Sequence, residues 1–240
     1  MILQVNNVTK HFGGIKAVNG VSFNVNDREI VGIIGPNGAG KTTVFNLISG
    51  AFPVTSGSVV FQGEEITNQK ANLICKKGIG RTFQIVKPFG SISVLENVMV
   101  GSYNWTSRPR EAREYALEIL EKVDLVHRKD DVAKSLTIAD KKRLEVAKAL
   151  ATKPKLLLLD EVMAGLNPSE VSEIIPVIGN LVNDGISLVI IEHIMAVIME
   201  LSHKVVVIHH GEKITEGSPQ EVTSDPKVIE AYLGEAVTSA

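Results

Sequence analysis

One stretch of the sequence determines the fold: Ile30-Val-Gly-Ile-Ile-Gly35-Pro-Asn-Gly-Ala-Gly40-Lys41-Thr42-Thr43-Val-Phe-Asn-Leu-Ile48. It begins with a short apolar run, continues with a loop rich in glycine and ends with a segment of helical character. Residues 35–43 match the spacing G-x-x-x-x-G-K-[ST]. Glycines permit positive φ angles and close backbone approach, so consecutive N–H groups can surround phosphate oxygens, and the dipole of the following helix favours the same anion. The motif in this context predicts a strand, a phosphate-binding loop and a helix, in that order.

The side chains of this loop are suited to hold a nucleotide. Lys41 supplies a mobile cation for the β- and γ-phosphates, and the hydroxyl of Thr42 is suited to bind Mg²⁺. A glycine-rich turn with an incidental lysine is the alternative, and the strand before the loop and the helix after it argue against that. We therefore expect a site for ATP and Mg²⁺. The residues expected to contact them are Gly35, Pro36, Asn37, Gly38, Ala39, Gly40, Lys41, Thr42 and Thr43.

The composition is that of a compact globular chain. The 240 residues are 44% hydrophobic, which is enough for one large α/β domain or a domain with an inserted subdomain. With 25 basic and 27 acidic side chains the net charge is −2, so the chain has no excess positive charge for a long phosphate backbone, and we expect no nucleic-acid partner. The single cysteine, Cys75, excludes an internal disulfide and is expected to be a partly buried thiol.

No segment has the character of a membrane anchor. The N-terminus lacks a basic region followed by a long apolar run, and no apolar run approaches the ~20 residues that a membrane-spanning helix needs. We therefore expect a cytoplasmic protein whose work on a membrane, if any, is done through a partner.

Short apolar runs alternate with helix-length segments, which predicts an α/β fold with a buried, largely parallel sheet. The expected strands are 29–34, 58–61, 155–159, 187–191 and 204–208. From about residue 94 to 151 the apolar periodicity becomes helical. We expect a single domain with a catalytic core at 1–90 and 152–234, a helical subdomain at 91–151 and a tail at 235–240.

Two carboxylates follow a strand-like run of leucines, Leu156-Leu-Leu-Leu-Asp160-Glu161. The carboxyl edge of a parallel sheet is where an acid can lie beside a metal, so we expect Asp160 to hold Mg²⁺ through water. Glu161 would then face the attacking water as a general base or orienting acceptor. The alternative is a core strand that enters a solvated turn, which is the commoner case for such a run by itself. The position of this run after a phosphate loop favours the catalytic interpretation instead.

A histidine ends another apolar strand, Ile190-Ile-Glu-His193. His193 is expected at the same sheet edge, where it can reach a γ-phosphate or orient Glu161. A capping or surface histidine is the alternative, and it is the preferred interpretation for His11, His127, His203, His209 and His210.

The order of these motifs closely resembles the ATP-binding cassette (ABC) family over nearly the whole chain. The resemblance implies that Gln84, in Arg81-Thr-Phe-Gln84, senses the metal and the attacking water. It also implies that the ring of Phe12, in Lys10-His-Phe-Gly-Gly, stacks on adenine. A core position is the alternative for Phe12. The resemblance also implies an N-terminal antiparallel β portion, a mixed, largely parallel sheet and the inserted helical subdomain.

Further segments resemble the ABC subunits of branched-chain amino acid importers. They are Gly80-Arg-Thr-Phe-Gln84, Val94-Leu-Glu-Asn-Val98-Met-Val-Gly101 and Asp225-Pro-Lys-Val-Ile-Glu-Ala-Tyr-Leu-Gly234. The resemblance implies a peripheral ATPase on the cytoplasmic face of the inner membrane. Its implied partners are two transmembrane permease subunits, a second cassette and, indirectly, a periplasmic solute-binding protein. Similar segments occur in cassettes for urea or amide import and, more distantly, for lipopolysaccharide export, so these stay as alternatives.

The segment that departs from the family is its signature. The usual Leu-Ser-Gly-Gly-Gln is here Leu136-Thr-Ile-Ala-Asp140. The resemblance implies that Thr137 and Ala139 contact the nucleotide of an opposing cassette, Thr137 through its hydroxyl. Asp140 would either bring a negative charge near that anion or cap the helix. The three cations that follow could offset the charge of Asp140; they are Lys141, Lys142 and Arg143. Such a basic triplet is usually a solvated helix face.

Two other classes of function remain open. A non-transport ABC ATPase acting on DNA or ribosomes would carry a long coiled-coil insert or a second cassette, and the sequence has neither heptads nor the length. A catalytically silent nucleotide-binding regulator is favoured by the altered signature alone. The retention of Lys41, Glu161 and His193 speaks against it.

Overall fold

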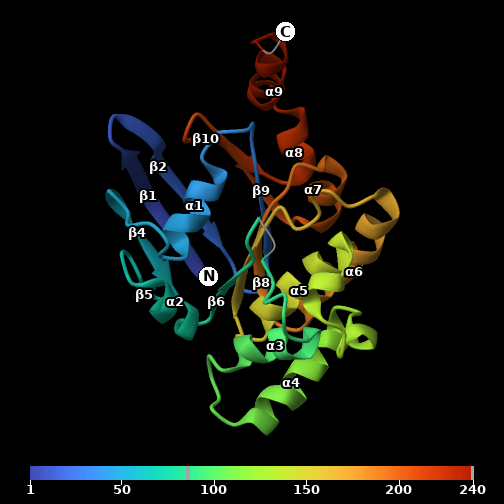
Figure 1. Ribbon diagram of the computed structural model, residues 1–240. Helices are drawn as coiled ribbons and strands as arrows, with labels where there is room; N and C mark the ends of the chain where they lie inside the picture. Colours follow the sequence, from blue (N-terminus) through green and yellow to red (C-terminus); the bar gives the residue numbers. More distant parts are fainter. Residues whose placement is uncertain (85–86, 239–240) are drawn as a thin grey trace. The chain divides into compact units, whose positions relative to one another are not determined.

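The computed structural model describes residues 1–84 and 87–238 (Figure 1). The chain divides into two compact units. The first unit combines residues 1–74 with the chain from 187 onwards, and the second consists of residues 75–186. Helix α2, Ala71–Lys77, contains the boundary between them.

The first unit contains an antiparallel sheet with the strand order β2-β1-β4-β5. Its strands are β1, Leu3–Phe12; β2, Ile15–Val25; β4, Ser56–Phe61; and β5, Glu64–Glu65. The turn between β1 and β2 passes through Gly13 at a φ of 56°, a left-handed conformation that glycine adopts without strain. The expected N-terminal antiparallel portion is therefore confirmed.

The first unit also contains a mixed set of strands in the order β10-β9-β3-β8. The strand β3, Ile30–Ile34, runs parallel to β8, Ser187–Ile191, and to β9, Lys204–His209, while β10, Glu212–Gly217, is antiparallel to β9. Every residue of β3 and β8 is buried, as expected for strands covered on both faces. The helices of this unit are α1, Lys41–Ile48; α7, Met195–Leu201; α8, Pro219–Ser224; and α9, Pro226–Thr238.

The second unit consists of a pair of parallel strands and most of the helices. Its strands are β6, Ile79–Arg81, and β7, Leu156–Asp160. Its helices are α3, Val94–Ser102; α4, Pro109–Lys122; α5, Ile138–Leu150; α6, Pro168–Asn183; and two 3₁₀ turns, Val126–Arg128 and Ala133–Ser135. Val98, Leu120 and Leu144 are fully buried, one on each of α3, α4 and α5. The five expected strands and the helical character of residues 94–151 are thus confirmed, with strand ends shifted by one or two residues.

The units found by contact do not follow the boundaries expected from the sequence. The second unit begins before residue 91 and ends after residue 151, because it includes β6, β7 and α6 together with the helices. Helix α9 extends to Thr238, so much of the expected tail at 235–240 is helical, and residues 239–240 lie outside the described residues. The 91–151 subdomain remains a prediction about domain organisation. Among the described residues, we find no helix with the length and apolarity to cross a bilayer.

The start of α6 has residues that are typical of a helix N-terminus. Asn167 is the N-cap and accepts a hydrogen bond from the backbone N–H of Glu170, whose carboxylate in turn accepts one from the N–H of Asn167. Pro168 occupies the first helical position, where its missing N–H is not needed.

Replacing Asn167 by alanine should lower the free energy of unfolding by about 1 kcal/mol, because a backbone N–H in the first turn loses its acceptor. Urea denaturation followed by circular dichroism measures this change. The matched control is Ser169→Ala in the same exposed turn, which should change the free energy by less than about 0.5 kcal/mol. Equal losses in the two variants would contradict the capping role.

Candidate nucleotide site

The phosphate loop of the first unit adopts a backbone that side chains would obstruct. Gly35, Gly38 and Gly40 have φ angles of 149°, 78° and 102°. A Cβ atom on Gly35 would lie 1.9 Å from the carbonyl oxygen of Ile208, and one on Gly40 would lie 2.5 Å from the carbonyl oxygen of Ala17. Glycine is therefore required at both positions for steric reasons as well as for the backbone conformation.

Lys41 is the first residue of α1, and its side chain reaches back to this loop. Its side chain is buried, and its Nζ donates hydrogen bonds to the carbonyl oxygens of Gly35, at 2.6 Å, and Pro36, at 2.8 Å. Asn37 and Gly38 are exposed at the tip. The loop is anchored to the start of β10 by a hydrogen bond from the N–H of Gly211 to the carbonyl of Ala39. The ammonium group is thus held by the loop that the sequence predicts to surround the phosphates.

Strand register brings His193 to the same edge as the loop. Strands β3 and β8 are parallel, with Ile33 opposite Ile191, so Gly35 and His193 both lie two residues beyond this pair. His193 is exposed in the connection between β8 and α7. His193 therefore leaves the carboxyl end of β8 beside the end of β3 from which the loop begins, and its role in hydrolysis stays a prediction.

Phe12, at the end of β1, is a surface aromatic. Its side chain is 43% exposed, which excludes the alternative that it is a core residue. The ring of Phe52 packs edge-on against it at a centroid distance of 5.3 Å. Lys10 Nζ lies 5.0 Å from the centroid of Phe12 and donates to the carbonyl of Pro53 at 2.8 Å. The ring is thus positioned by neighbours and still has surface available for stacking.

In the second unit, the parallel pairing of β6 with β7 brings the acids and Gln84 together. Arg81 lies opposite Leu158, so Gln84 and Glu161 are each three residues beyond that pair. Gln84 Nε2 donates to Glu161 Oε2 at 2.6 Å. The two residues that the sequence assigned to the attacking water are therefore in direct contact.

Asp160 is almost fully buried at 1% exposure and forms an ion pair with Arg81, Nη2 to Oδ2 at 3.1 Å. The backbone N–H of Asp160 donates to Thr82 Oγ1 at 3.0 Å. Burial lowers the pKa of the Arg81 guanidinium, and the Asp160 carboxylate acts in the opposite direction. The sequence did not lead us to expect Arg81 as a partner of Asp160. The signal that could have indicated it is the position of Arg81 at the end of β6, three residues before Gln84.

The signature segment caps α5. Thr137 is the N-cap and accepts a hydrogen bond from the N–H of Asp140 at 3.1 Å. Ala139 is half-buried, and Ile138 is 64% exposed. The Asp140 carboxylate lies 3.6 Å from the guanidinium of Arg128. The charge of Asp140 thus has a basic partner that the sequence did not indicate.

The interpretation of the basic triplet as a solvated helix face was wrong for two of its members. Lys142 and Arg143 are buried, at 7% and 8% exposure. Lys142 Nζ donates to the carbonyl oxygen of Glu161 at 2.8 Å, and Arg143 pairs with Asp124 and Glu173. These two cations have specific partners within the second unit.

The candidate residues therefore form two groups. One is in the first unit and consists of the phosphate loop, His193 and Phe12. The other is in the second unit and consists of Gln84, Asp160 and Glu161, with Thr137 and Ala139 at the start of α5.

Comparison with known proteins assigns a family. A family model described as ABC transporter matches residues 18–164. The chain belongs to the ABC transporter family. A second model, described as branched-chain amino acid ATP-binding cassette transporter, matches residues 212–238. ABC cassettes bind adenine nucleotides, dimerise and work with transmembrane subunits.

Relatives of this ABC protein carry names that agree with one another. It is 39% identical to the high-affinity branched-chain amino acid transport ATP-binding protein BraF of Pseudomonas aeruginosa, over 98% of both chains. It is 36% identical to the corresponding LivG of Escherichia coli, again over 98% of both. A probable branched-chain amino acid transport ATP-binding protein LivG of Methanocaldococcus jannaschii is 37% identical over the same shares.

Solved structures of other ABC cassettes resemble the whole fold. The ADP conformation of an ATP-binding cassette of an ABC transporter has a TM-score of 0.88 at 35% identity, covering 97% of this chain and 98% of the other. A dimeric bacterial ABC transporter cassette has a TM-score of 0.83 at 26% identity, covering 91% and 99%. The expected fold class, an ABC ATPase core with helices and a mixed sheet, is therefore confirmed.

Gly35→Ala should abolish binding of a fluorescent ATP analogue, since the added methyl group would collide with the backbone at Ile208. The matched control is Gly63→Ala, because Gly63 also has a positive φ, of 79°, but has open space around its Cβ position. That control should lose only about 1–2 kcal/mol of stability and keep nucleotide affinity. Fluorescence titration and urea denaturation measure the two effects, and normal affinity in Gly35→Ala would contradict the steric argument.

Proposed function

We propose that this chain is the ATP-hydrolysing subunit of a transporter that imports branched-chain amino acids. The observation that carries the proposal is the direct contact between Gln84 and Glu161 at the end of a buried parallel strand pair, in a chain that also has a complete phosphate loop. The names of the relatives and the match at residues 212–238 support the branched-chain substrate over urea, amides or lipopolysaccharide.

Binding of ATP is assigned to the first group. The backbone N–H groups that residues 35–43 offer, Pro36 having none, hold the phosphates together with the ammonium of Lys41, and Phe12 stacks on the adenine. The exposed ring of Phe12 supports this role, because a buried ring would have no free face.

The donor set fits Mg²⁺. Asp160, Thr42 and Gln84 offer a carboxylate, a hydroxyl and an amide oxygen, and Mg²⁺ prefers such hard oxygen ligands. In the described part of the chain no cluster of three or more His, Cys, Asp or Glu side chains forms a metal cage. When bound, Mg²⁺ neutralises charge that develops on the β- and γ-phosphates.

Glu161 accepts a proton from the attacking water or orients it, and Gln84 fixes one oxygen of its carboxylate. His193 contacts the γ-phosphate side of the site from the edge beside the loop. In this mechanism the chain supplies position and charge, because phosphoryl transfer needs little covalent help from the protein.

The assembly contains a second cassette and two transmembrane permeases at the cytoplasmic face of the inner membrane, with a periplasmic solute-binding protein as an indirect partner. Thr137 and Ala139 at the start of α5 contact the nucleotide held by the second cassette. The exposure of Thr137 and the N-terminal dipole of α5 support this role. Residues 91–151 form the helical subdomain that carries this segment.

Glu161→Gln should lower the steady-state ATPase rate by about 10² to 10⁴-fold, because the carboxylate can no longer accept a proton. ATP should then stabilise a dimer that size-exclusion chromatography detects. Lys41→Ala should lose both hydrolysis and nucleotide binding. The control Glu118→Gln makes the same chemical change on the exposed face of α4 and should match the wild type.

The substrate is tested in cells. Cells that carry Glu161→Gln in place of the wild-type gene should lose uptake of labelled leucine and keep uptake of labelled urea. Full leucine uptake with an inactive ATPase would overturn the assignment of the substrate, while an active Glu161→Gln enzyme would overturn the assignment of the base.

A further inference from the structure

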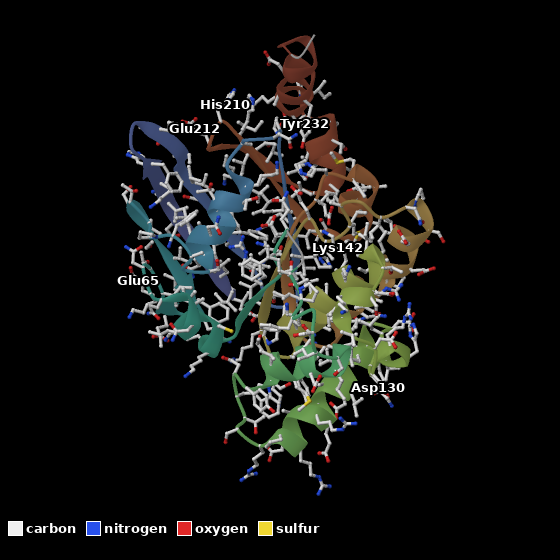
Figure 2. All side chains as sticks on the ribbon, in the orientation of Figure 1. Glu65, Asp130, Lys142, His210, Glu212 and Tyr232 are labelled. Carbon is white, nitrogen blue, oxygen red and sulfur yellow. The ribbon has the colours of Figure 1, made fainter. Side chains whose placement is uncertain are left out.

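Lys142 is a buried cation that the proposed mechanism does not use. It lies on α5 in the second unit and is labelled in Figure 2. Its side chain is 7% exposed, and burial of an ammonium group is strongly unfavourable unless the charge has hydrogen-bond partners. Its Nζ donates to the backbone carbonyl oxygen of Glu161 at 2.8 Å. A charge-assisted hydrogen bond to a carbonyl is stronger than a neutral one, so this contact holds the backbone of Glu161 firmly.

The backbone of Glu161 needs such support. Glu161 has a φ angle of +50°, a left-handed conformation that is unusual for a residue with a Cβ atom. Residues in sparsely populated backbone regions persist when the surrounding structure determines them from several sides. The carbonyl of Glu161 accepts from Lys142 and also, at 3.3 Å, from the N–H of Ala164. These two bonds fix the turn that directs the Glu161 side chain out of β7.

We propose that Lys142 is a positioning residue for hydrolysis. By holding the carbonyl of Glu161 it fixes the left-handed turn, and the turn sets the direction of the carboxylate that Gln84 holds from the other side. The inference rests on the proposed function of Glu161 as the base or orienting acceptor. It differs from that proposal because it gives Lys142 a role in holding the backbone of Glu161 and no chemical step of its own.

The placement of Lys142 has a consequence for the signature segment. Lys142 lies five residues after Thr137, the N-cap of α5, on the same helix. A single rigid helix therefore carries both the segment proposed to contact a partner's nucleotide and the amine that holds this chain's own base.

The neighbouring residue offers a matched control. Arg143 is on the same helix, is also a cation and is equally buried at 8% exposure. Its guanidinium binds Asp124, at 3.0 Å, and Glu173, at 2.8 Å. Neither partner is part of the candidate site, so loss of Arg143 should affect stability and leave the geometry of the base unchanged.

The experiment compares Lys142→Met, Lys142→Arg and Arg143→Met in the full chain. Lys142→Met should lower kcat by about 10- to 100-fold, since small misplacements of a reacting group have effects of this size. Its KM and its equilibrium affinity for a fluorescent ATP analogue should stay within about twofold of the wild type, because the phosphate loop is untouched. Lys142→Arg keeps a donor and should recover most of the lost kcat. Arg143→Met should lower the unfolding temperature and change kcat by less than about twofold.

A double variant separates positioning from general damage. In a Glu161→Gln background, adding Lys142→Met should change the residual rate by less than about twofold, because there is no carboxylate left to position. A further loss as large as that in the wild-type background would overturn the inference, as would a normal kcat in Lys142→Met or no recovery in Lys142→Arg. If Glu161→Gln itself hydrolyses ATP normally, the proposed role of Glu161 fails first. If Glu161→Gln is inactive and Lys142→Met is normal, the positioning inference alone fails.

Discussion

Parallel strand pairing is the constraint on which the candidate site depends. In the first unit, the register of β3 with β8 makes the phosphate loop and His193 leave the sheet at one edge. In the second unit, the register of β6 with β7 does the same for Gln84 and Glu161. A one-residue slip in either pair would turn every side chain of the strand to the opposite face, so the register decides which side chains meet where the strands end.

Left-handed backbone is the second feature that both units share, and they achieve it in different ways. The phosphate loop uses glycine, and at Gly35 and Gly40 neighbouring carbonyl oxygens leave no room for a Cβ atom. At Glu161 the side chain is needed for chemistry, so glycine is excluded and the strained turn is supported by hydrogen bonds from Lys142 and Ala164. Strain at a functional residue is stable only with such external support.

Local patterns were enough to predict much of this protein. The five apolar runs are strands, and residues 35–43 form the glycine-rich loop together with the first turn of α1. Each of these is determined by residues close in sequence. The partners of buried charges could not be predicted in the same way. Arg81 meets Asp160 across 79 positions, and Lys142 meets Glu161 across 19, and no local periodicity encodes such a pairing. The sequence pattern of three cations in a row instead suggested a solvated face, because exposure is the usual fate of Lys and Arg.

The same limit explains why the altered signature looked more damaging in the sequence than it does in the structure. From the sequence alone, Asp140 brings a negative charge near a phosphate or caps the helix, and the only cations at hand to offset that charge were the basic triplet that follows it. In the folded chain its carboxylate lies near Arg128, the N-cap role is taken by Thr137, and the apolar side chain of Ile138 is exposed. The surface offered at the start of α5 is therefore a hydroxyl with an adjacent aliphatic group, and the acid is partly neutralised within its own unit. Loss of both signature glycines changes the shape of this surface, but it does not make the surface simply anionic.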